Sequence, residues 1–184
     1  MSLTTKKALA ASLKKLLEKT TLDKITVKDI VQDCEVNRQT FYYHFQDVYA
    51  LLEWIFVNEA TKVISNNKTY DTWQQGFLQA FQYVEQNKTL VVNAYHSIGR
   101  EHLERYLYDV VYKLLIDVVN EKAEGMRVSE VDKQFIADFY KYAFVGLMLE
   151  WIRTGMKERP EDTIDKLSKL ITGDIHRALL KYEQ

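Results

Sequence analysis

The scarcity of helix-breaking residues is the feature that most constrains this chain. Its 184 residues include one proline and six glycines. No run alternates apolar and polar residues over the length of a strand. Because proline and glycine are the residues that interrupt helices, their scarcity indicates long helices joined by simple turns. We therefore expect an all-α fold.

Apolar residues recur every three or four positions along most of the chain, the period of a helix with one buried face. Leu9, Leu13, Leu16 and Leu17 form the first such stripe. Gly125 and residues 155–160 are the clearest breaks. The pattern predicts helices over about 4–20, 26–34, 37–43, 47–65 (closed by residues 66–68), 70–87, 89–97, 100–122, 130–156 and 161–182.

Composition narrows the class of protein. Hydrophobic residues make up 47% of the chain and charged residues 28%, which favours a globular protein over a disordered one. The single cysteine, Cys34, cannot form an internal disulfide, which suits a reducing cytoplasm. No apolar run is long enough to predict a membrane span. The sequence also lacks zinc-binding motifs, a glycine-rich phosphate-binding loop and the Gly-x-Ser-x-Gly motif of a nucleophile elbow. We therefore expect that the protein is not an enzyme and that it binds no cofactor or metal.

Residues 26–45 carry the pattern of a helix-turn-helix. Thr26, with Asp29 three residues later, is close to a capping box, and Asn37 is a good N-cap for a second helix. Such a pair of short helices places its second helix in the DNA major groove. The apolar residues that would pack the pair on the first helix are Ile30, Val31, Val36, Phe41 and Phe45.

Polar residues dominate the faces of the helix over 37–43 that do not pack on the first helix. Arginine pairs with guanine, asparagine and glutamine pair with adenine, and hydroxyl and imidazole groups bind phosphate. Residues 1–45 carry a net charge of +3 and the remainder −4, which is compatible with DNA contact at one end. Core packing of the Tyr-Tyr-His run is the alternative. The candidate residues are Asn37, Arg38, Gln39, Thr40, Tyr42, Tyr43 and His44.

These residues resemble the signature of the TetR-family regulators. The resemblance lies in Thr26-Val27, Asp29-Ile30, Val36, Thr40-Phe41-Tyr42, His44-Phe45 and Leu51-Leu52. It implies a homodimer with DNA-binding heads, here residues 1–46, and a helical domain, here 47–184, for dimerisation and signal binding. By position it also implies that Thr26 and Lys28 contact a phosphate, that Asn37, Arg38 and Gln39 reach bases, and that Thr40, Tyr42, Tyr43 and His44 contact the DNA backbone.

Two positions depart from the family pattern. Glu35 stands where the turn usually has glycine, which predicts a different backbone conformation there. Val48 replaces a common lysine, which removes one phosphate contact and predicts moderate affinity.

Residues 37–54 and 149–161 are similar to a DhaS-like subgroup that includes regulators of dihydroxyacetone kinase operons. That similarity implies an activator working with a protein co-regulator.

The segment over 130–156 is apolar on two sides, so we expect one side to face a second copy of the chain. A fully internal helix in a monomer is the alternative. In the dimer, the helix over 130–156 and the last helix of each copy would form a four-helix contact across a two-fold axis. The candidate dimer residues are Phe139, Tyr142, Gly146, Leu149, Ile164, Leu167, Ile171 and Ile175.

Aromatic residues are dense after residue 70, and pockets between helices are mostly apolar with a few polar groups. Aromatic residues at helical spacing form core more often than a pocket, so core packing is the strong alternative, and a protein interface is another. The candidate effector-pocket residues are Phe77, Phe81, Tyr95, His96, Tyr106, Phe144 and Trp151.

The expected partners are a palindromic double-stranded operator, a second copy of the chain, and a small-molecule effector or protein co-regulator, with no membrane. The rival hypothesis is an all-helical interaction module that no longer binds DNA. The exposed face with Arg38, Gln39 and Tyr42 favours the DNA-binding reading over this rival.

Overall fold

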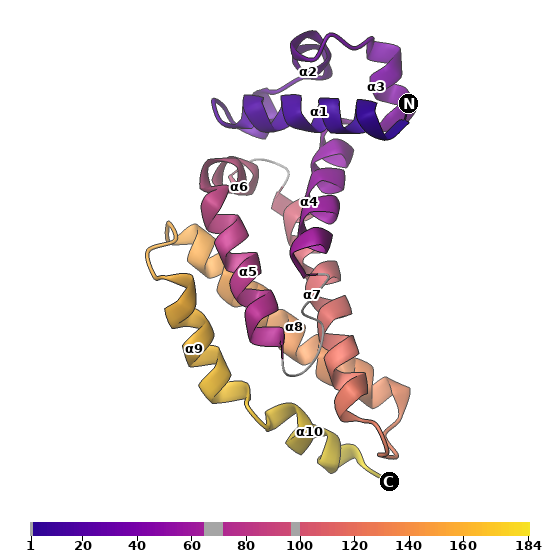
Figure 1. The fold of residues 1–184 in the computed structure, drawn as a ribbon, viewed down its shortest axis with the longest axis vertical. Helices are drawn as coiled ribbons and strands as arrows, with labels where there is room; N and C mark the ends of the chain where they lie inside the picture. Colours follow the sequence, from indigo (N-terminus) through magenta and orange to yellow (C-terminus); the bar gives the residue numbers. More distant parts are fainter. Residues whose placement is uncertain (1, 65–71, 97–99) are drawn as a thin grey trace. The chain divides into compact units, whose positions relative to one another are not determined.

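The computed structural model describes residues 2–64, 72–96 and 100–184, and within these ranges the chain forms helices and no strand (Figure 1). The all-α prediction is confirmed. The predicted closure of the fourth helix at residues 66–68 lies outside the described ranges. The helices are α1 (Ser2–Leu17), η1 (Leu22–Lys24), α2 (Val27–Asp33), α3 (Arg38–His44), α4 (Val48–Ile64), α5 (Trp73–Gln86), α6 (Lys88–Tyr95), α7 (Arg100–Lys122), α8 (Glu130–Arg153), α9 (Pro160–Ile171) and α10 (Asp174–Tyr182).

The chain divides into two compact units. The first comprises Met1–Glu59 and Asn87–Tyr106, and the second comprises Ala60–Gln86 and Leu107–Gln184. The first unit therefore includes α6 and most of α4 in addition to the three N-terminal helices. The functional boundary predicted between residues 46 and 47 is a different kind of division and stays a prediction.

In the first unit, α1 is the helix on which the others pack. Its residues Leu9, Leu13 and Leu17 are fully buried, and α2, α3 and α6 all contact it. Two side chains satisfy backbone carbonyls across these contacts. Ser12 Oγ donates to the Ile30 carbonyl of α2 at 3.0 Å, and Asn93 Nδ2 of α6 donates to the Leu17 carbonyl at 2.6 Å. Because buried or terminal carbonyls need partners, these bonds fix the helices in register.

In the second unit, aromatic rings fill the space among α5, α8 and their neighbours. Phe77 stacks on Phe144 with ring centroids 4.0 Å apart, and the Phe81 and Trp151 rings lie 5.0 Å apart. All four side chains are buried. Since aromatic pairs combine a large buried area with ring–ring attraction, they are a main source of cohesion in this unit.

The prediction of one continuous last helix over 161–182 is wrong. Helix α9 ends at Ile171 and α10 begins at Asp174, with Gly173 between them in the left-handed conformation at φ +82°. Glycine adopts this conformation without steric cost, which allows the chain to turn. The apolar residues keep a helical period across the break, so the periodicity gave no sign of it. After the turn, α10 contacts both α8 and α9.

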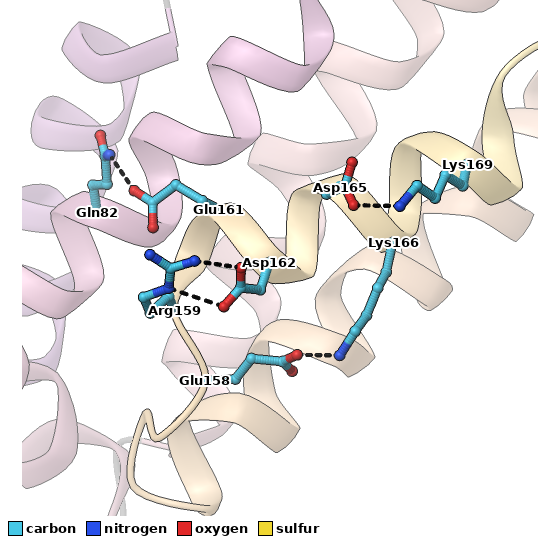
Figure 2. Close-up of polar contacts among 8 residues, drawn as sticks. All are labelled: Gln82, Glu158, Arg159, Glu161, Asp162, Asp165, Lys166 and Lys169. Atoms are coloured by element: carbon cyan, nitrogen blue, oxygen red, sulfur yellow. Dashed lines mark hydrogen bonds and ion pairs between the residues drawn. The ribbon is translucent and has the colours of Figure 1, made fainter.

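Helix α9 has a buried apolar face and an ion-paired outer face. Figure 2 shows Arg159 paired with Asp162 at 2.7 Å and Lys169 paired with Asp165 at 2.6 Å. In the same view, Gln82 of α5 donates to the Glu161 carboxylate at 3.1 Å. Pro160 occupies the first turn, followed by two acids that favour the positive end of the helix dipole, as predicted. The outer face of α9 therefore has the character of a solvated surface.

Candidate nucleic-acid interface

A capping box begins α2, as the sequence predicts. The Asp29 amide donates to Thr26 Oγ1 at 3.3 Å, and the Asp29 carboxylate accepts from the Thr26 amide at 2.9 Å. The Thr26 hydroxyl also donates to that carboxylate at 2.6 Å. These bonds from Thr26 hold the pKa of Asp29 below its ordinary value, because they favour the charged carboxylate. A phosphate contact by the Thr26 hydroxyl would therefore compete with Asp29.

The turn between α2 and α3 keeps the conformation that glycine normally provides. Glu35 has φ +54°, in the left-handed region, and the Val36 amide donates to the Val31 carbonyl at 2.9 Å. The expectation of a different backbone at Glu35 is wrong, because the turn closed by this bond keeps the left-handed conformation with a non-glycine residue. A non-glycine residue in this conformation carries steric strain of about 1–2 kcal/mol.

Helix α3 is capped at its start and anchored by one aromatic side chain. The Gln39 amide donates to Asn37 Oδ1 at 2.8 Å, so the predicted N-cap is confirmed. Phe41 is fully buried, and Phe45, directly after the helix, is also buried. This anchoring leaves the opposite side of a seven-residue helix to face outward.

The outward side of α3 carries most of the candidate DNA-binding side chains. Arg38, Gln39, Tyr42 and Tyr43 are exposed, Tyr43 to 83%, while Thr40 and His44 are half-buried. Asn37, Thr26 and Lys28 are exposed nearby in the sequence. Core packing of the two tyrosines is thus excluded within this chain. Whether these side chains contact DNA stays a proposal.

One pair on this face is brought together in a way that the sequence did not reveal. Arg38 Nη2 donates to the Tyr42 hydroxyl at 3.3 Å, and the guanidinium carbon lies 5.6 Å from the centroid of the Tyr42 ring. The spacing of four residues was visible, but nothing in it distinguished this pairing from two independent side chains.

Further residues that sequence reasoning missed hold α1 against the motif. Lys15 Nζ lies 2.5 Å from Asp33 Oδ1, and Lys6 Nζ lies 5.5 Å from the centroid of the Phe45 ring. Hydrogen bonds from Lys15 and Ser12 lower the pKa of Asp33. No local motif announces these contacts, because they join residues that are 18 or more positions apart in the sequence.

Cys34, at the end of α2, is half-buried. Burial raises the pKa of its thiol, which lowers the fraction of reactive thiolate. A packing role fits this environment better than redox sensing.

Across the part of the chain that the structure describes, no group of three or more His, Cys, Asp or Glu is placed to hold a metal ion. Within those same residues, no helix is both long and apolar enough to cross a membrane.

The candidate effector residues separate into two groups. Phe77, Phe81, Phe144 and Trp151 belong to the aromatic core of the second unit. In the first unit, Tyr95 and Tyr106 are buried and His96 is exposed. The Tyr106 hydroxyl donates to the Phe56 carbonyl. These contacts favour core packing, the alternative for the aromatic residues, and an effector pocket stays a prediction.

The candidate dimer residues divide into an exposed group on α8 and a buried group on α9 and α10. Phe139, Tyr142 and Gly146 lie exposed on α8, with Phe139 at 63%, and Leu149 is half-buried. In contrast, Ile164, Leu167, Ile171 and Ile175 are buried within their own chain. These four residues are therefore unavailable to a partner, and the predicted interface needs revision in this part.

A groove that the sequence did not predict lies between α8 and α10. It has a volume of about 570 Å³. Four of its nine lining residues are aromatic, and its three charged residues, Asp174, Arg177 and Lys181, all lie on α10. The residues that line it include Phe135, Phe139, Tyr140, Arg177, Lys181 and Tyr182. The groove thus places exposed aromatic side chains of α8 beside a charged face of α10.

Comparison with known proteins gives a consistent result. The TetR-type family described as "Transcriptional regulator C-terminal region" matches residues 71–173, more than half of the chain. The HTH-type dhaKLM operon transcriptional activator DhaS of Lactococcus lactis subsp. lactis (strain IL1403) is 29% identical over 157 residues. This match covers 84% of the present chain and 82% of the relative.

Solved structures share the fold. A structure of the dihydroxyacetone kinase operon activator DhaS has a TM-score of 0.71 and 25% identity, covering 98% of each chain. A TetR transcriptional regulator from Streptococcus agalactiae 2603V has a TM-score of 0.58 and 20% identity, covering 100% of this chain and 96% of its own. At 20% identity, the similarity to the Streptococcus agalactiae structure shows a shared fold and nothing more.

Proposed function

The chain belongs to the TetR family of transcriptional regulators, and from this premise we propose that it binds a palindromic operator as a homodimer. The observation that carries the proposal is the construction of α3. An asparagine cap and a buried phenylalanine fix the helix, and its polar side chains face outward. A short helix presented in this way fits the major groove of B-form DNA.

The side chains of the motif divide into two roles. Arg38, Gln39 and Asn37 lie at the start of α3, where a recognition helix meets base edges. The hydroxyl and imidazole groups of Thr40, Tyr43 and His44 suit phosphate oxygens, as does the Lys28 ammonium. Thr26 contributes mainly by ordering α2 through its capping box. Phosphate contacts would supply affinity, and base contacts would supply specificity.

The dimer contact proposed here uses α8 and α10. Monomeric proteins rarely expose large contiguous apolar patches, and here Phe135, Phe139 and Tyr142 on α8 all stand more than half exposed. Leu180 and Tyr182 of α10 are exposed as well. A two-fold axis would bury the same patch on both copies and set the spacing of the two recognition helices.

The target and the signal follow from the relatives. DhaS is an activator of a dihydroxyacetone kinase operon, and we extend that role to this chain. A ligand or a protein co-regulator at the second unit would control operator binding by favouring one spacing of the heads over another. Such a regulator acts on the chromosome, in the cytoplasm.

The experiment that tests the proposal is a selection of binding sites from random duplex DNA with the purified protein, followed by a salt titration. We expect a palindrome whose affinity falls steeply as salt rises, because phosphate contacts release counterions. Arg38→Ala should weaken binding to this palindrome while staying dimeric by sedimentation. If the wild-type protein recovers no motif at low salt, an interaction module without DNA binding becomes the better explanation.

A further inference from the structure

The Arg38–Tyr42 pair on α3 carries an inference about how the operator is read, and this inference rests on the proposed function. We propose that Tyr42 is a positioning residue that orients the Arg38 guanidinium toward a guanine in each half-site. Family position alone assigns Tyr42 to the DNA backbone. The geometry of this chain gives it a second task.

The contact has two components that act on the same guanidinium. Arg38 Nη2 donates to the Tyr42 hydroxyl at 3.3 Å, which is a long hydrogen bond. The guanidinium carbon also lies 5.6 Å from the ring centroid, within the range of a cation–π attraction. Together they limit where the head group of a long and otherwise mobile side chain can lie.

The helix geometry makes this contact a natural consequence of the sequence spacing. Residues four apart lie on one face of a helix, and side chains lean toward its N-terminus. Tyr42 therefore leans back over Arg38, the first residue of α3. The Tyr42 ring also meets the edge of the Phe41 ring, with centroids 5.6 Å apart. Because Phe41 is fully buried, the tyrosine is supported from the core of the unit.

The choice of partner matters as much as its position. Arg153, Arg159 and Arg177 each pair with a carboxylate three residues away in the sequence. Among the described residues, Arg38 has Tyr42 as its partner and no carboxylate. A neutral hydroxyl orients the guanidinium without cancelling the positive charge that DNA attracts.

The remaining donors are sufficient for base recognition. A guanidinium has five N–H groups, and the bond to Tyr42 uses one of them. Arginine bonded through two N–H groups to guanine O6 and N7 is the commonest specific contact in the major groove. Fixing the side chain before binding reduces the rotamer freedom that is lost on binding, which strengthens the selective contact.

The test compares base preference in five proteins, using the operator recovered by selection and its single-base variants. They are the wild type and the variants Arg38→Ala, Tyr42→Phe, Tyr42→Ala and Tyr43→Phe. Arg38→Ala should lose discrimination at one symmetric guanine position, by roughly 5- to 100-fold. Tyr42→Phe keeps the ring but removes the hydroxyl, and should relax the same position by about three- to tenfold. Tyr43→Phe is the matched control, since Tyr43 is an exposed neighbour outside the Arg38 contact. We expect Tyr43→Phe to weaken all sequences alike and to leave the salt slope unchanged, because a neutral hydroxyl on a phosphate releases no counterion.

A change confined to the position that Arg38 reads would support the positioning role of Tyr42. A Tyr42→Phe protein that weakens every sequence equally, as Tyr43→Phe does, would overturn it and leave Tyr42 as a backbone contact. If the loss appears in Tyr42→Ala but not in Tyr42→Phe, the ring orients Arg38 and the role stands. Far-ultraviolet circular dichroism checks that each variant folds. Failure of the wild-type protein to select any palindrome is a distinct result, which would overturn the proposed function and this inference with it.

Discussion

Lys14 Nζ of α1 lies 2.9 Å from Glu59 Oε1 of α4, and neither side chain is more than a third exposed. The ammonium also lies 3.1 Å from the second carboxylate oxygen. This pair joins the helix that supports the motif to the helix that leads away from it. A shift of α4 would therefore act on α1 through this contact.

A double-mutant cycle on Lys14→Ala and Glu59→Ala should give a coupling of about 1 kcal/mol in the free energy of unfolding, the upper end for ion pairs near a surface. The matched control is the exposed pair of Asp165 and Lys169 on α9, where solvent screens the charges more. Urea unfolding at low and high salt measures both. Equal coupling in the two pairs would show that the α1–α4 contact has no special role.

Glu35→Gly should raise the free energy of unfolding by about 1 kcal/mol, because glycine relieves the left-handed strain at φ +54°. The greater freedom of glycine in the unfolded chain offsets part of that gain. Glu35→Ala keeps a Cβ atom and should give no such increase. A urea midpoint that rises equally in both variants would point to the lost charge instead of the backbone.

The capping box should make the stability of α2 sensitive to acid. Because the folded pKa of Asp29 is lowered from 3.8 by its bonds from Thr26, the stabilisation is present above pH 3.8 and is lost as pH falls through the lower folded value. Thr26→Ala removes those bonds. Urea midpoints between pH 7 and pH 2.5 should therefore differ most between wild type and Thr26→Ala at neutral pH and converge in acid. A difference independent of pH would contradict the role given to Asp29.

Phe139→Glu should convert the proposed dimer to a monomer, because it would place one charge from each copy in the proposed contact on α8. Leu170→Glu is the control, since Leu170 is 70% exposed on the ion-paired side of α9, against 63% for Phe139. Sedimentation velocity at micromolar concentration distinguishes the two states. A monomeric Leu170→Glu together with a dimeric Phe139→Glu would move the interface to α9.

The local parts of the site were predictable because their signals are local. Thr26 with Asp29 and Asn37 with Gln39 are bonds between residues two or three positions apart, so the caps could be read from the chain. The burial of Phe41 followed from the same helical spacing. The left-handed Glu35 was not predictable, since its own propensity argues against a conformation that the turn between α2 and α3 requires.

By itself the sequence determined the helical class, the bounds of the helix-turn-helix and the polar face of α3. These features depend on residue type and short spacing, which act before the chain is packed. The tertiary structure decided which apolar faces are covered. Ile164, Leu167 and Ile171 on α9 are buried by their own chain, whereas Phe139 and Tyr142 on α8 are left uncovered. Periodicity shows that a helix has an apolar side, but only long-range packing selects what lies against it.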